Sequence, residues 1–127
     1  MIPHDPKSRK QYPIGTGVID YFPDALAEVA HVSFIGNEQH NPGTPLHWDR
    51  SKSGDEADAM MRHFTERGKM DTDGIRHSAK MAWRALALLQ KELEAEKSMV
   101  VFDQGQSILS GGGSQSVSLR NDCNISI

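Results

Sequence analysis

The chain has 127 residues, of which 37% are hydrophobic and 24% charged, with 14 basic and 17 acidic side chains. The length favours one domain, and the formal net charge of −3 argues against nucleic acid as the main partner. The single cysteine, Cys123, excludes an intrachain disulfide and any zinc site built from several cysteines. No apolar stretch approaches the ~20 residues of a membrane span. We therefore expect a cytoplasmic protein with no membrane partner.

Residues 1–21 are predicted to form an extended or irregular N-terminal arm. Pro3, Pro6 and Pro13 each disfavour helix at the residue that precedes them. A small basic cluster in this arm fits either a solvated tail or an arm that reaches an anionic ligand.

A first helix is predicted over about residues 22–36. Pro23 suits the first helical position, where its missing N–H costs no hydrogen bond, and Gly36 is the expected terminator. Two acids and a histidine follow with spacings of four and three, which places them on one helix face: Asp24, Glu28 and His31.

A loop is predicted over residues 37–53, where Asn-Pro-Gly and Thr-Pro are typical turn sequences. Trp48 in this loop either caps the core or stacks on a planar ligand. The second helix is predicted over about 54–67, with Ser53 as its N-cap in a capping box completed by Glu56. The polar residues of this helix that bear on chemistry are Asp55 and Asp58, and also Glu56 and His63, which share one side of the helix two turns apart.

The third helix is predicted over about 73–97, because apolar side chains repeat there at spacings of four and three. This narrow seam is typical of a coiled coil, and we expect it to be buried, partly against a second subunit: Ile75, Ala79, Ala82, Leu86, Leu89 and Leu93. Residues 98–127 are predicted to be a tail that contains a Gly/Ser linker at 110–114. The predicted fold is all-α, a small bundle of three main helices over 22–97 that is completed by oligomerisation.

The polar stripes of the three helices are the candidate site. If the apolar seams pack together, these stripes converge on one cleft, and facing carboxylates are how helical bundles hold Mg²⁺ or Mn²⁺. Lys80 and Arg84 would then neutralise a triphosphate. The first-turn acids and Asp58 also have a structural explanation, since first-turn acids complement the helix dipole and Asp58 can pair with Arg62. Glu28 and His77 lie beyond the first-turn positions and border the apolar seams.

Several segments together resemble a small phage-associated family, the N-terminal domain of dATP/dGTP diphosphohydrolase. The resemblance covers about residues 8–95 and is carried by five motifs in order: DYFPDALAEVA at 20–30, GNEQHNP at 36–42, Trp48, Arg62-His63 and DTDGIRHSAKMAWRALALL at 71–89.

The resemblance implies an all-α, Mg²⁺- or Mn²⁺-dependent pyrophosphohydrolase that acts on purine deoxynucleoside triphosphates and assembles as a dimer or tetramer. That activity is similar to the activity of MazG-type enzymes, whose helices carry EExxE and ExxD motifs. Asp24 and Glu28 can stand for two acids of the first motif, and Asp55 and Asp58 for the second. The closer family's own pattern emphasises His63, the acidic turn at Asp71 or Asp73, and His77.

These implications assign roles to twelve residues. The predicted catalytic residues are Glu28, His63 and His77. The predicted metal ligands are Glu28, Asp24, Asp55, Asp58 and Asp73. The predicted substrate-binding residues are Lys80, Arg84, His40, Trp48 and Asn37.

The predicted reaction is hydrolysis of dGTP or dATP to the monophosphate and pyrophosphate, in phage nucleotide-pool control within the host cytoplasm. One alternative is a non-catalytic phage module that uses the same cleft to bind a nucleotide or a host protein. A further alternative is a structural assembly protein that binds no nucleotide.

Overall fold

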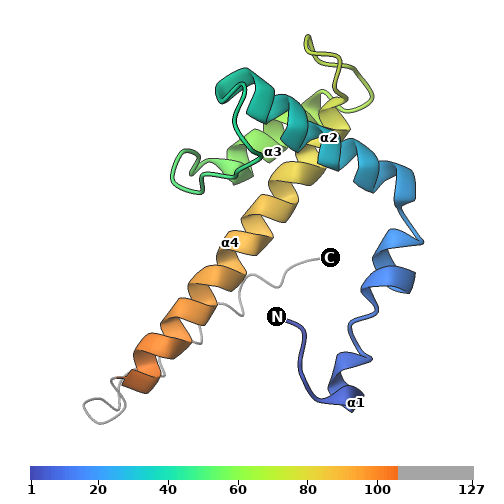
Figure 1. Ribbon diagram of the computed structural model, residues 1–127. Helices are drawn as coiled ribbons and strands as arrows, with labels where there is room; N and C mark the ends of the chain where they lie inside the picture. The colour runs from blue at the N-terminus through green and yellow to red at the C-terminus, as the bar shows by residue number, and fades with distance from the viewer. Residues whose placement is uncertain (106–127) are drawn as a thin grey trace. The chain divides into compact units, whose positions relative to one another are not determined.

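The computed structural model describes residues 1–105, and it describes side-chain surroundings through residue 100. The regular elements in this part of the chain are all helical: α1 Pro6–Arg9, the π-helix η1 Gly15–Ile19, α2 Pro23–His40, α3 Glu56–Thr65 and α4 His77–Gly105 (Figure 1). Between residues 22 and 97 the strand geometry is limited to an isolated antiparallel bridge between Met70 and Arg76. The predicted all-α class is confirmed.

The first predicted helix is α2, and it is longer than expected at its C-terminal end. Pro23 occupies the first turn as predicted, together with Asp24. The prediction that Gly36 terminates the helix is wrong, because the helix continues to His40. It ends where Pro42 disfavours helix at the preceding residue, and Gly43 then turns the chain with a φ of 81°.

The second predicted helix, α3, is shorter at both ends than the sequence indicated. The N-cap position is occupied by Asp55 and not by the predicted Ser53, and the Asp55 side chain caps no backbone N–H. The helix ends at Thr65, and Gly68 then turns the chain with a φ of 87°, a left-handed conformation that glycine adopts without strain.

A tight turn precedes α4 and delays the start of this helix from the predicted residue 73 to His77. The Asp71 amide donates to the Ile75 carbonyl over 2.8 Å, and the His77 amide donates to the Lys69 carbonyl over 3.1 Å. Gly74, with a φ of 81°, allows the reversal. The segment between Lys69 and Arg76 is therefore a closed loop, which places its side chains beside the first turns of α4.

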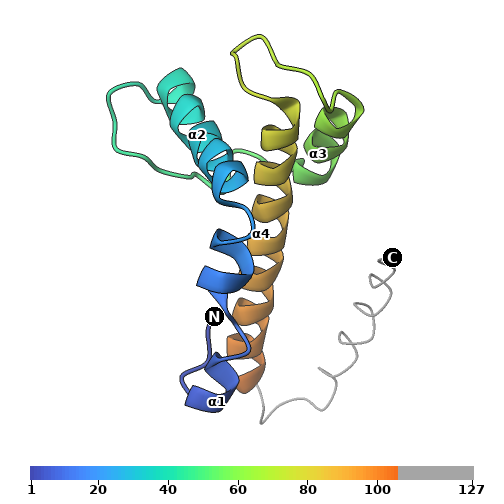
Figure 2. The ribbon, with the colours of Figure 1, turned by 90° about the vertical axis from the view of Figure 1, so that its right-hand side faces the viewer.

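The core of the unit formed by Met1–Leu88 consists mainly of small side chains, with Ala59, Ile75, Ala79 and Ala87 all buried. In this unit α2 and α3 lie on two sides of the first turns of α4 (Figures 1 and 2). The predicted burial of the seam is therefore confirmed at its start. Three leucines farther along remain about half exposed in a single chain, at 51%, 50% and 48%: Leu86, Leu89 and Leu93.

The two predicted flanking segments contain more helix than the sequence indicated. In the arm, the Asp5 carboxylate accepts a hydrogen bond from the Ser8 amide over 2.9 Å and so caps α1. At the other end, α4 extends to Gly105 and thus into the predicted tail. The predicted Gly/Ser linker at 110–114 lies outside the described residues. Within residues 1–105, no helix is both long and apolar enough to cross a bilayer.

Candidate functional site

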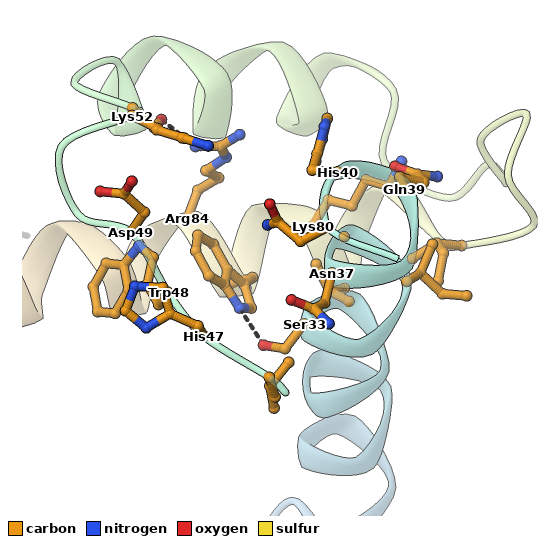
Figure 3. A pocket seen from close by; sticks show the side chains of 18 of the residues that line it. Ser33, Asn37, Gln39, His40, His47, Trp48, Asp49, Lys52, Lys80 and Arg84 are labelled. Atoms are coloured by element: carbon orange, nitrogen blue, oxygen red, sulfur yellow. Dashed lines mark hydrogen bonds between the residues drawn. The ribbon is translucent and has the colours of Figure 1, made fainter. Parts of the chain in front are cut away.

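A pocket of about 880 Å³ lies within the unit Met1–Leu88. Five parts of the chain form its wall: the C-terminal half of α2, the loop that leads to α3, one residue of α3, the turn before α4, and the first turns of α4. This volume is within the ~300–1,000 Å³ of ordinary small-molecule sites. In Figure 3, His47 and Trp48 gather at one side of the pocket, while Gln39, His40 and Lys80 lie at the other.

The aromatic end of the pocket is built around two tryptophans. The ring centroids of Trp48 and Trp83 are 5.6 Å apart in an edge-to-face arrangement, which is favourable for aromatic pairs. The Trp83 indole N–H donates to the Ser33 hydroxyl over 2.8 Å (Figure 3), which fixes the ring against α2. The Arg50 guanidinium lies 4.0 Å from the Trp48 ring centroid, a cation–π distance. The loop tryptophan therefore belongs to the pocket wall.

Asn37 attaches the long loop to α2. Its side-chain amide donates to the Thr44 carbonyl over 3.0 Å, one helical turn after Ser33 on the same face. The residue is buried, and its Oδ1 has no hydrogen-bond partner in the described part of the chain. Asn37 is thus a structural element of the pocket wall as well as a predicted substrate contact.

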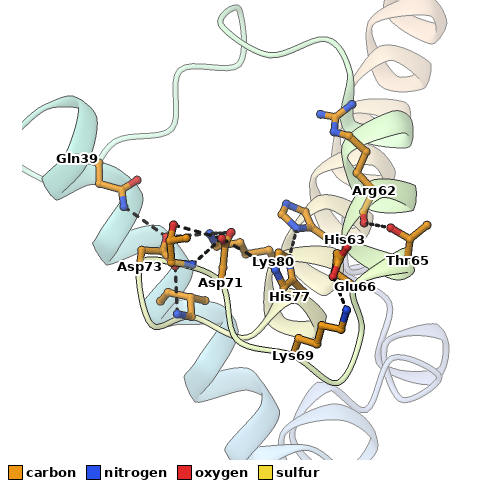
Figure 4. Close-up of polar contacts among 12 residues, drawn as sticks. Gln39, Arg62, His63, Thr65, Glu66, Lys69, Asp71, Asp73, His77 and Lys80 are labelled. Atoms are coloured by element: carbon orange, nitrogen blue, oxygen red, sulfur yellow. Dashed lines mark hydrogen bonds and ion pairs between the residues drawn. The ribbon is translucent and has the colours of Figure 1, made fainter.

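The polar end of the pocket is organised by Lys80 (Figure 4). Its ammonium group donates to Asp71 Oδ2 over 2.6 Å and to Asp73 Oδ2 over 2.7 Å. The bond from Lys80 and the amide of Thr72 lower the pKa of Asp71 to about 2. Burial alone would lower the pKa of Lys80, but its bonds with the two aspartates outweigh burial and raise it. All three groups are therefore charged at neutral pH.

A pair of histidines lies beside this ion-pair network. His63 Nδ1 and His77 Nδ1 are 3.0 Å apart, and Asp71 Oδ1 is 4.0 Å from His77 Nε2 (Figure 4). Burial lowers the pKa of His63, and the neighbouring His77 and cationic side chains lower it further. The His63 ring is therefore neutral at neutral pH and carries a nitrogen lone pair. It also faces the pocket.

Arg84 connects the pocket to α3. Its guanidinium donates to the Ser53 hydroxyl over 2.7 Å and lies 3.9 Å from Glu56 Oε1. Glu56 is buried, so the positive charge of Arg84 offsets the negative charge of a carboxylate inside the protein. Asp55, also on the pocket wall, pairs with the exposed Arg62 over 3.1 Å.

The structure brings nine of the twelve predicted site residues to this region. Eight of them line the pocket, and His77 contacts one of the eight: Asn37, His40, Trp48, Asp55, His63, Asp73, Lys80 and Arg84. The other three are exposed and lie outside the lining: Asp24, Glu28 and Asp58.

The predicted convergence of Glu28 with the other residues is therefore not seen. Glu28 precedes Asn37 by nine residues, which in a helix corresponds to ~13 Å along the axis and about half a rotation around it. The oxygen-only Mg²⁺ cage built from Glu28 and the aspartates does not assemble in the described residues. The group of three metal-capable side chains that does form is mixed: His63, Asp71 and His77.

Several residues that make these contacts are absent from the predicted catalytic, metal-binding and substrate-binding residues, among them Ser33, Gln39, Glu56, Asp71 and Trp83. The family pattern had marked the turn at Asp71 or Asp73, so the signal for Asp71 was present. Gln39, whose side chain donates to Asp73 over 3.4 Å, lies in the family motif at 36–42. Trp83 lies in the family motif at 71–89 and adjoins Arg84, so both motifs contained residues of the pocket whose roles were not predicted.

Comparison with known proteins supports the resemblance. Residues 5–100 match the family model described as dATP/dGTP diphosphohydrolase, N-terminal. The chain belongs to this family. No curated protein sequence and no solved structure matches the chain. The family match spans α2, α3 and the turn before α4, and so contains the whole pocket.

Proposed function

We propose that the protein hydrolyses purine deoxynucleoside triphosphates to the monophosphate and pyrophosphate. The observation that carries this proposal is that the pocket lies entirely within the segment that matches the diphosphohydrolase family. Water attacks the α-phosphorus, the bond between this phosphorus and the bridging oxygen breaks, and pyrophosphate leaves. The setting we propose is the nucleotide pool of a phage-infected cell.

In this proposal the two ends of the pocket bind different parts of the nucleotide. The base lies against Trp48 and Trp83, because an aromatic wall offers stacking or edge contacts to a purine. The triphosphate extends toward Lys80 and Arg84. His63 and His77 are then the groups nearest the scissile phosphate.

The charge of the pocket supports a requirement for a divalent ion such as Mg²⁺ or Mn²⁺. Cationic and anionic side chains balance along the wall, three of each: Lys52, Lys80 and Arg84 against Asp49, Asp55 and Asp73. The side chains alone therefore leave a triphosphate uncompensated. When bound, a divalent ion would neutralise the charge that develops on the phosphates.

The competing proposal is a nucleotide-binding module without catalysis. It is favoured by one observation, namely that Lys80 is bound to both Asp71 and Asp73 and so has less charge to offer a phosphate. Binding without turnover is the outcome that this alternative predicts.

The test is to incubate catalytic amounts of the protein with each dNTP and either Mg²⁺ or Mn²⁺, resolving pyrophosphate from orthophosphate. We expect turnover of dGTP and dATP with pyrophosphate as product. Trp48→Ala should raise KM by about 5- to 10-fold, since aromatic contacts contribute ~0.5–1.5 kcal/mol. The control is Phe34→Ala, an exposed aromatic outside the pocket, which should leave KM unchanged. Saturable binding without product would instead establish the binding module.

We also propose that the active form is a homo-oligomer, joined through the part of the α4 seam that a single chain leaves half exposed. A charge at such a seam is costly to bury. Leu86→Asp should therefore convert the oligomer to a monomer in sedimentation analysis, whereas Met61→Asp, an equally exposed position on α3, should not. A monomeric wild-type protein would contradict this proposal.

A further inference from the structure

The two histidines and Asp71 form a group whose donor atoms are close enough to share one ion. One ligand atom from each residue lies within 4.8 Å of the other two. The closest pair, His63 Nδ1 and His77 Nδ1, is 3.0 Å apart. Two ring nitrogens bound to one ion at ~2.0–2.1 Å are separated by roughly 3.0–3.4 Å. The histidine pair is thus already near the spacing of two ligands, and the carboxylate oxygen, which lies within 4.8 Å of a nitrogen of each ring, has to move closer to complete the set.

The three side chains come from different elements, and their backbones are held in place independently of any ion. His63 is on α3, Asp71 is in the closed turn, and His77 is the first residue of α4. The histidine side chains are partly shielded and still reachable, with His77 at 15% exposure. A small solute can enter, because His63 lines the pocket.

The neighbours of Asp71 hold its carboxylate in a fixed orientation and in its ionised form, as a metal ligand requires. Asp71 accepts hydrogen bonds from Lys80 and from the Thr72 amide, which fix its orientation and keep it ionised. Supporting hydrogen bonds of this kind are the usual outer shell of a metal-bound carboxylate. Lys80 does not repel a cation from the group, because its charge is already matched by two aspartates. Lys80, Asp71 and Asp73 together carry one net negative charge.

The donor set selects the class of ion. Mg²⁺ prefers oxygen ligands in octahedral geometry, whereas imidazole nitrogen suits first-row transition metals. Two histidines and one carboxylate also leave positions open for water or phosphate oxygen. We propose that His63, Asp71 and His77 bind one divalent transition-metal ion, of the class Mn²⁺, Fe²⁺, Co²⁺ or Zn²⁺, at the polar end of the pocket.

This site differs from the carboxylate cage that the sequence predicted, both in its ligands and in the ions that it favours. It does not depend on the proposed hydrolysis, because the ion is bound by the protein without nucleotide. The competing explanation of the 3.0 Å contact is a hydrogen bond between two neutral rings. That explanation predicts no metal affinity.

The test uses the full-length protein, freed of metal by a chelator, and titrates Mn²⁺, Co²⁺, Zn²⁺ and Mg²⁺ separately by calorimetry. We expect one transition-metal ion per chain, bound at least about tenfold more tightly than Mg²⁺. His63→Ala, His77→Ala and Asp71→Asn should each weaken binding by at least about tenfold, because a ligand matters at least as much as an outer-shell partner. His31→Ala, an exposed histidine outside the pocket, is the matched control and should bind like wild type.

A second measurement avoids the risk that a variant fails to fold. In the wild-type protein, Mn²⁺ should broaden the imidazole NMR signals of His63 and His77 before those of His31. The inference is overturned if no ion binds, if Mg²⁺ binds as tightly as Mn²⁺, or if the three variants bind like the control. Ion binding without dNTP turnover would reject the proposed function and support the metal site. Turnover without ion binding at these histidines would reject the metal site and support the proposed function.

Discussion

Two stripes of polar residues have nearly the same spacing, but one is exposed to solvent and the other forms part of the pocket region. Asp24, Glu28 and His31 follow each other at four and three residues on α2, and all three are exposed. The second stripe consists of Asp73, His77, Lys80 and Arg84, spaced by four, three and four residues. Asp73 pairs with Lys80, His77 contacts His63, and Arg84 lines the pocket. Spacing alone therefore does not make a site.

The difference lies in what surrounds each stripe. The turn before α4 folds back so that Asp71 and Asp73 reach Lys80, which lies in the first turn of α4. α3 supplies His63 from another direction. The α2 stripe has no such turn beside it, and its face points away from Asn37 and the pocket. A site forms where a helix face meets a second element that is held by backbone hydrogen bonds.

The largest expected effect contrasts one acid from each region. Asp71→Asn keeps the size of the side chain and removes the charge, and we expect kcat for dGTP hydrolysis to fall by about 100-fold, the upper range for support of a metal or phosphate site. Glu28→Gln should change kcat by less than about twofold, because Glu28 is exposed and outside the pocket. Steady-state kinetics on both variants measure this contrast. A larger fall in kcat for Glu28→Gln than for Asp71→Asn would instead place the active site at the α2 stripe.

A smaller effect is expected on stability when the lysine at the centre of the network is removed. Lys80 is 19% exposed and pairs with two aspartates, so Lys80→Met leaves two partly buried carboxylates facing each other. We expect a loss of about 1–3 kcal/mol in the free energy of unfolding. Lys69→Met removes the more exposed pair with Glu66 and should cost less than about 0.5 kcal/mol. Urea denaturation compares the two, and equal losses would mean that the Lys80 network contributes little.

The sequence predicted the elements well and the helix ends less well. Proline and capping signals located the first two main helices, apolar spacing located the third, and the family motifs pointed to His63, His77 and the acidic turn. Glycine often ends helices, which is why the sequence predicts an end at Gly36, but the backbone of Gly36 is helical and α2 continues into the pocket. Local propensity cannot reveal this, because the contacts made by the last two turns of α2 come from Thr44 and Trp83.

The predicted site residues that lie outside the pocket share one feature. Asp24, Glu28 and Asp58 were assigned by analogy to carboxylate motifs, which assume that particular helix faces meet. Here the facing surfaces are set by Trp83 on Ser33 and by His63 on His77, contacts between residues 50 and 14 positions apart in the chain. No spacing within a single helix encodes such pairings.

The smallest expected effect is a pH dependence that belongs to the second stripe. The bond from Lys80 lowers the pKa of Asp71 to about 2 from an ordinary 3.8, so the unfolded chain binds more protons than the folded protein between these values. The stabilisation by Asp71 is therefore complete above pH 3.8 and is lost as the pH falls toward 2, amounting to at most about 2 kcal/mol. The pKa of Asp73 is lowered by the same lysine, which adds to the slope in the same direction. Urea denaturation of wild type and Lys80→Met across this range should show a flatter pH dependence in the variant, while Lys69→Met keeps the wild-type slope. Parallel curves for all three proteins would mean that the turn and the first turns of α4 are not coupled through Lys80, and that the two stripes do not differ in their electrostatics.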